Sequence, residues 1–143
     1  MELKDQVCSY EQAVKIYELG LFLRANKVWA QDFFIKSRRY IESRGIMGID
    51  TIINNNNSKK PFSLYYPAPD SSELIDILPP AVDDGHGVDT ILKIIKGPEL
   101  YIVMYEDDDS NILESFHYEN LAESLAHCLI WLIENKHISV EEL

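Results

Sequence analysis

One glycine-containing loop gathers side chains that could bind a divalent metal ion or transfer a proton. Asp83, Asp84, His86 and Asp89 all lie within residues 83–89. Carboxylate and imidazole groups are common ligands of divalent ions, and imidazole titrates near neutral pH. Their spacing matches no metal or catalytic motif, so the sequence favours a polar loop. A small enzyme that uses this loop is the alternative function.

A second acidic stretch begins like the calcium-binding loop of an EF-hand. Asp107, Asp109 and Asn111 follow the spacing of its first three ligand positions. The sixth position needs glycine but is Ile112, and the twelfth needs glutamate but is Tyr118. The sequence therefore predicts an acidic hairpin turn, and it predicts no metal site and no cofactor.

Cysteine and histidine could together form a nucleophilic pair, but their positions do not favour one. Cys8 and Cys128 are far apart in apolar contexts, which predicts two buried thiols in a reducing compartment. His127 is adjacent to Cys128, and neighbouring helix positions point about 100° apart. No G-x-S-x-G, H-E-x-x-H or C-x-x-C motif occurs, so the sequence does not indicate an enzyme.

Basic and aromatic side chains are combined in one cluster, as they are in sites for single-stranded nucleic acid. Its members are Phe33, Phe34, Lys36, Arg38, Arg39, Tyr40 and Arg44. The net charge of −11 opposes binding to a polyanion, so the favoured interpretation is a solvated edge.

The charge is distributed unevenly along the chain. Residues 1–60 carry a balance of +3, whereas residues 61–143 carry −14. Such asymmetry can indicate an interaction surface or a solvated acidic face, and the sequence favours the solvated face because acidic surfaces are common. If the chain acts by binding, we expect a protein partner with a basic face, or a homo-oligomer, rather than nucleic acid.

Length and composition predict a single domain over residues 1–143. The chain is 46% hydrophobic and 26% charged, as globular proteins are. Its longest strongly apolar run, residues 128–133, is far shorter than the roughly 20 residues of a membrane span. The first seven residues lack the apolar segment of a signal peptide. We therefore expect a cytoplasmic protein with no membrane partner.

Three helices are predicted by capping residues followed by apolar positions at helical spacing. They cover residues 10–19, two turns that stop before Pro79, and residues 121–134, and a further turn is expected after Ser139. The capping residues are Ser9, Asp70 and Asn120. The residues expected to end the first and last helices in the left-handed conformation are Gly20 and Asn135. The last helix is apolar on nearly all sides, so we expect it at the centre of the core.

Three strands are predicted to form an antiparallel meander over residues 90–117, at 90–96, 99–106 and 111–117. In the second strand, Leu100, Ile102 and Met104 alternate with Tyr101, Val103 and Tyr105.

The other segments carry weaker signals. Residues 62–66 are predicted to form a short strand, and residues 54–61 and 81–89 are predicted to form loops. Residues 28–35 fit either a strand or part of a helix over 27–44, and their aromatic content favours the strand.

Two stretches carry a resemblance to a known group. Residues 6–20 (QVCSYEQAVKIYELG) and 121–139 (LAESLAHCLIWLIENKHIS) are similar to small uncharacterised proteins encoded by phages and integrative elements of gut bacteria. Residues 68–80 (APDSSELIDILPP) resemble the middle helix of that group. The resemblance implies a mobile-element origin and a bacterial host. It implies no reaction, and residues 21–67 match nothing in the group.

These observations predict an α+β fold in which a small antiparallel sheet packs against the N-terminal and C-terminal helices. The expected function is that of an accessory protein of a mobile element that acts by protein–protein interaction, in one version as an acidic inhibitor of a host factor. A virion structural component is a further alternative. The candidate binding residues are Asp107, Asp108, Asp109, Asp83, Asp84 and His86.

Overall fold

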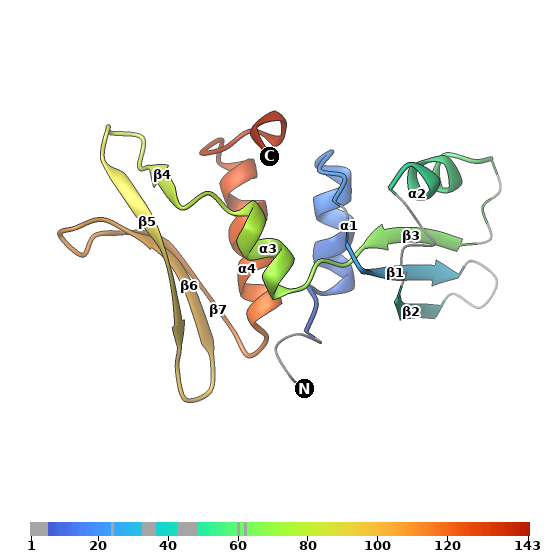
Figure 1. Cartoon of the computed structure of the whole chain (residues 1–143), viewed down its shortest axis with the longest axis horizontal. Coiled ribbons are helices and arrows are strands. Elements are labelled where there is room, and N and C mark those ends of the chain that lie inside the picture. Colours follow the sequence, from blue (N-terminus) through green and yellow to red (C-terminus); the bar gives the residue numbers. More distant parts are fainter. Residues whose placement is uncertain (1–5, 24, 33–36, 43–48, 60, 62) are drawn as a thin grey trace.

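The computed structural model contains two antiparallel sheets on opposite sides of a layer of helices (Figure 1). It describes residues 6–23, 25–32, 37–42, 49–59, 61 and 63–143. The elements run in the order α1 (Tyr10–Glu18), β1 (Lys27–Asp32), β2 (Ser37–Glu42), α2 (Ile49–Asn56), β3 (Ser63–Pro67), α3 (Ser71–Ile77), β4 (Ala81–Asp83), β5 (Asp89–Lys96), β6 (Tyr101–Glu106), β7 (Ile112–Tyr118) and α4 (Leu121–Glu134), followed by a short 3₁₀ helix (Val140–Glu142). The predicted α+β class is confirmed.

α4 is the central helix of the fold. It packs on β6 and β7 on one side and on α1 and α3 on the other, and α1 in turn contacts β3. Leu125, Leu129 and Leu132 of α4 have no exposed surface. The expectation that this helix forms the centre of the core is confirmed.

The predicted capping boxes begin α1 and α3. Ser9 Oγ accepts the N–H of Gln12, and Gln12 Oε1 accepts the N–H of Ser9, both at 3.1 Å. Asp70 and Glu73 exchange the same pair of bonds at 2.8 and 3.1 Å. These reciprocal bonds satisfy N–H groups that have no partner inside the helix, so two residues close in sequence fix where each helix begins.

The helix ends differ from one another. Gly20, just beyond α1, has the expected left-handed conformation with φ of 88°. Asn135 after α4 does not, because its φ is −93°, and Lys136 takes the left-handed conformation instead. That prediction for Asn135 was wrong by one residue. The final 3₁₀ helix forms after Ser139, but the Ser139 side chain makes no capping bond.

The smaller sheet has the strand order β2-β1-β3 and is fully antiparallel. Residues 27–32 form its central strand, so the alternative of a helix over 27–44 is wrong. Aromatic packing ties this sheet to α1, because the ring of Tyr10 packs edge-on against those of Trp29 and Tyr66. The Trp29 indole also donates to Cys8 O at 2.9 Å. Sequence reasoning did not foresee the sheet as a unit.

The loop predicted for residues 54–61 is present at residues 57–59, which form a turn and bends, but the prediction was wrong for most of the asparagine run. Its first three residues complete α2, and two of them bind the backbone of β3. Asn55 Nδ2 donates to Ser63 O at 2.8 Å, and Asn56 Nδ2 donates to Tyr65 O at 2.7 Å. Asn56 Oδ1 also accepts the Tyr65 N–H at 3.0 Å. These tertiary bonds offset the weak helix propensity of asparagine.

The larger sheet is the predicted meander with one additional strand. Its order is β4-β5-β6-β7, with antiparallel pairing throughout. β4 was predicted to be part of a loop over residues 81–89, and that prediction was wrong for residues 81–83. Val82 is buried on β4, and Thr90 Oγ1 donates to Val82 O at 2.7 Å. A three-residue strand carries too little alternation to be recognised in the sequence.

Candidate interaction surface

The aspartates of the β4–β5 turn build the turn that contains them. Asp83 Oδ1 accepts the N–H groups of Gly85 and Gly87, at 2.7 and 3.3 Å. Asp84 Oδ1 likewise accepts the N–H groups of His86 and Val88, at 2.7 and 3.2 Å. Both glycines have positive φ, 93° and 84°, which a side chain would disfavour. His86 is exposed, and its ring makes no hydrogen bond, ion pair or ring contact with the described residues. One oxygen of each carboxylate is therefore committed to forming the turn, which agrees with the polar loop that the sequence favoured over a catalytic site.

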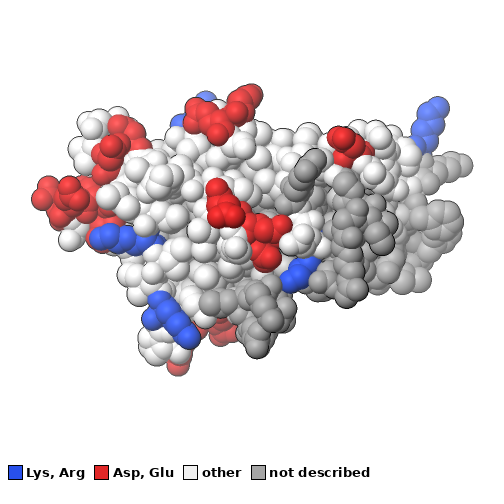
Figure 2. Space-filling view, viewed as in Figure 1, with Lys and Arg blue, Asp and Glu red and all other residues white. Residues whose placement is uncertain are grey.

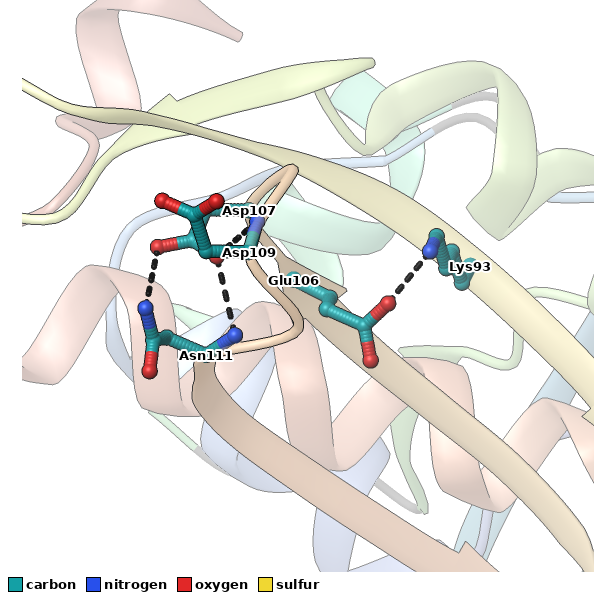
Figure 3. A network of polar contacts seen from close by, with 5 residues as sticks. All are labelled: Lys93, Glu106, Asp107, Asp109 and Asn111. Carbon is teal, nitrogen blue, oxygen red and sulfur yellow. Dashed lines mark hydrogen bonds and ion pairs between the residues drawn. The ribbon is translucent and has the colours of Figure 1, made fainter.

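Asp107 organises the β6–β7 turn in the same way (Figure 3). Its Oδ1 accepts the N–H of Asp109 at 2.9 Å and that of Asn111 at 2.8 Å, and its Oδ2 accepts Asn111 Nδ2 at 3.0 Å. These bonds, above all those from Asn111, hold the pKa of Asp107 below its ordinary value. Asp108 and Asp109 are exposed, and neither carboxylate is engaged by any residue that the structure describes.

The sheet topology brings the two acidic turns to the same end of one sheet. Asp83 pairs with Asp89, and two residues further along β5, Ile91 pairs with Glu106, which directly precedes Asp107. Figure 2 shows acidic side chains concentrated at this end of the molecule, on the left. Lys93 is close by and forms an ion pair with Glu106 across the strands (Figure 3). The two candidate sites from sequence are therefore parts of one acidic surface, hereafter the acidic end.

An apolar surface that the sequence analysis did not single out adjoins the acidic end. The outer face of the β4–β7 sheet points away from the helices (Figure 1). Its register places Ile91, Ile95 and Ile112 on this face, with 50%, 45% and 51% of their surface exposed. The alternation of Leu100, Ile102 and Met104 already indicated a second apolar face. What it could not indicate was that this face is open at its margins, where Ile91 and Ile112 are half exposed, whereas Met104 at its centre is only 8% exposed.

The cysteines and the neighbouring histidine do not form a nucleophilic pair. Both cysteines are free and buried, and burial raises the pKa of Cys8 and raises that of Cys128 to about 12. His127 is exposed, and its Nδ1 lies 3.0 Å from the Tyr118 hydroxyl rather than beside a thiol. Within the described residues, no three His, Cys, Asp or Glu side chains are grouped so that they could hold a metal ion.

The basic–aromatic cluster of the sequence analysis falls outside the described residues. This holds for the side chains of Phe33, Phe34, Lys36, Arg38, Arg39, Tyr40 and Arg44. In the part of the chain that is described, no helix has the length and apolar character needed to cross a membrane.

Comparison with known proteins identified no relative of this chain. No protein-family model matches the chain. The searches of curated proteins and of solved structures also found no match.

Proposed function

We propose that this chain is a non-enzymatic interaction protein whose acidic end binds a partner protein with a basic face. The observation that carries the proposal is the convergence of two acidic turns at one end of the sheet. Asp89, Asp108 and Asp109 present carboxylates there that no described residue engages. Lys93 is the nearby cation, and Glu106 already pairs with it.

Electrostatics favours a protein partner over nucleic acid. The two acidic turns follow strands that flank β5, β4 and β6, so they lie about 10 Å apart. This separation is comparable with the Debye length of about 8 Å at physiological salt, so the charges of the two turns are only partly screened from one another. Such a patch speeds the encounter with a basic surface and repels the phosphates of DNA or RNA. The apolar outer face next to it offers additional area to bury once contact is made.

The biological setting is part of the same proposal. The resemblance of residues 6–20 and 121–139 to small proteins of phages and integrative elements supports an accessory role in the cytoplasm of a bacterial host. An acidic inhibitor of a host factor fits this setting, because such a protein can occupy a basic site on its target. An enzyme built on residues 83–89 has less support, since Asp83 and Asp84 each commit an oxygen to the turn itself.

Affinity capture from a bacterial lysate, with matched variants, tests this proposal. The test variant is Asp108→Asn with Asp109→Asn, which removes two free carboxylates and none of the bonds that form the turn. The control is Glu141→Gln with Glu142→Gln, two exposed charges on the final 3₁₀ helix. We expect a bound protein that the parent and control retain and the test variant loses. Equal retention by both variants, or capture of nucleic acid alone, would contradict the proposal.

A further inference from the structure

One edge of the β4–β7 sheet is only partly covered. β4 pairs with residues 89–91 of β5, and Pro80 O accepts the Leu92 N–H at 3.0 Å. Beyond Leu92, no described strand pairs with this side of β5. The backbone groups of successive residues in an antiparallel strand point to alternate sides. The N–H and C=O groups of Ile94 and Lys96 therefore point outward, as those of Leu92 do.

The opposite edge, on β7, is protected by its own side chains. Ser115 donates its backbone N–H to Glu114 Oε1 at 3.1 Å, and its hydroxyl lies 3.0 Å from His117 Nε2. The pairing of β6 with β7 is also irregular at Tyr105 and Glu106. Charged side chains and bulges are common means by which edge strands avoid pairing with other chains. The free part of β5 carries one such charge, Lys96, but Ile94 and Ile95 beside it are apolar and 39% and 45% exposed.

We propose that two copies of this chain pair antiparallel along their β5 edges, about a two-fold axis at Ile95. In this register Ile94 of one copy lies opposite Lys96 of the other, and each such pair exchanges two backbone hydrogen bonds. Ile95 then faces its own symmetry mate on the outer face, with the Cα atoms about 4.5 Å apart. In this register Gly97 of the other copy lies opposite Lys93, so the new pairing ends just before Leu92, which is bonded to Pro80.

The charge distribution favours a second copy in this orientation. Asp89 is six residues from Ile95, so at roughly 3.3 Å per residue the two acidic ends lie about 40 Å apart. That separation is about five Debye lengths at physiological salt, and the repulsion between the ends is screened. Parallel pairing would instead place the acidic ends side by side. In the proposed register Lys96 lies opposite Ile94 of the other copy, and Lys93 is paired with Glu106 of its own copy, so no like charges stand directly opposite one another.

The proposed dimer is independent of the proposed partner, since both acidic ends remain free. Sedimentation velocity over a range of concentrations is the first test, and we expect a concentration-dependent dimer. Ile95→Lys should weaken dimerisation at least about tenfold, because it places like charges directly opposite one another. Ile112→Lys, equally exposed on the same face but on β7, should dimerise like the parent. A parent that stays monomeric at millimolar concentration would overturn the proposal, and so would equal weakening by Ile112→Lys.

Cysteine cross-linking tests the register. Ile95→Cys should give a disulfide-linked dimer under mild oxidation, since the expected Cα separation falls within the disulfide range of about 4.4–6.8 Å. Ile91→Cys is the control, because it is similarly exposed but would lie about 26 Å from its symmetry mate. The native Cys8 and Cys128 are buried and should not contribute. Cross-linking through Ile91→Cys and not through Ile95→Cys would overturn the register.

Discussion

Both faces of the β4–β7 sheet carry large apolar residues, but the two faces have different surroundings. On the inner face, Val103, Tyr105 and Phe116 are at most 4% exposed and belong to the core that includes α4. On the outer face, Ile91 and Ile112 remain about half exposed. Apolar character alone does not distinguish the two faces. The difference arises from topology, because helices cover one side of the sheet and no described element covers the other. We therefore assign folding stability to the inner face and contacts with other molecules to the outer face and the acidic end.

Removing side-chain volume from the core beneath the inner face, and from the outer face, should give the largest difference in the free energy of unfolding. Leu129, on α4, is fully buried, so Leu129→Ala should lower the free energy of unfolding by about 2–5 kcal/mol through lost burial and a cavity. Ile112→Ala on the outer face should cost less than about 1 kcal/mol. Denaturant unfolding of both variants checks this. Similar losses for the two variants would show that the outer face is also packed.

A buried hydroxyl on the inner face should give a smaller effect. The Tyr105 hydroxyl donates to Pro79 O at 2.6 Å, and burial raises the pKa of Tyr105. Tyr105→Phe should therefore lower the free energy of unfolding by about 0.5–1.5 kcal/mol. Tyr101→Phe is a control on the same face, because the Tyr101 hydroxyl bonds to no described residue. If both substitutions cost the same, the bond to Pro79 contributes nothing specific.

The smallest effect is expected in the β6–β7 turn, and it should depend on pH. The folded-state pKa of Asp107 lies below its ordinary value, so the stability from its ionised form is fully present above that ordinary value. This contribution is lost as the pH falls through the lowered folded-state pKa. Asp107→Asn should thus be slightly less stable than the parent at pH 7, and the difference should shrink towards about pH 2. A difference that stays constant with pH would show that Asp107 acts without its charge.

Local signals in the sequence predicted the local structure well. The starts of α1 and α3 depend on capping residues three positions apart. The pairs Ser9 with Gln12 and Asp70 with Glu73 therefore predicted both starts directly from the sequence. The alternation along β6 was sufficient to predict the meander. α2 was missed because its asparagines are held by bonds to β3, which only the tertiary fold supplies.

The sequence predicted the two parts of the candidate site separately. Both acidic turns were recognised from their composition, but their convergence depends on the pairing of β5 with β4 and β6, which no local pattern encodes. The sequence also did not predict that the aspartates have different roles. Asp83 and Asp107 each bind two backbone N–H groups of their own turns, whereas the Asp108 and Asp109 carboxylates face solvent. Only side-chain geometry separates these two roles.

The association rate of the captured partner protein is the most direct test of the binding role of the acidic end. It should be measured with the parent, with Asp108→Asn plus Asp109→Asn, and with the control Glu141→Gln plus Glu142→Gln. Charge steering acts mainly on association. We therefore predict a severalfold slower association for the first variant, a nearly unchanged dissociation rate, and parental kinetics for the control. Equal rates for all three proteins, or an effect confined to dissociation, would contradict the account.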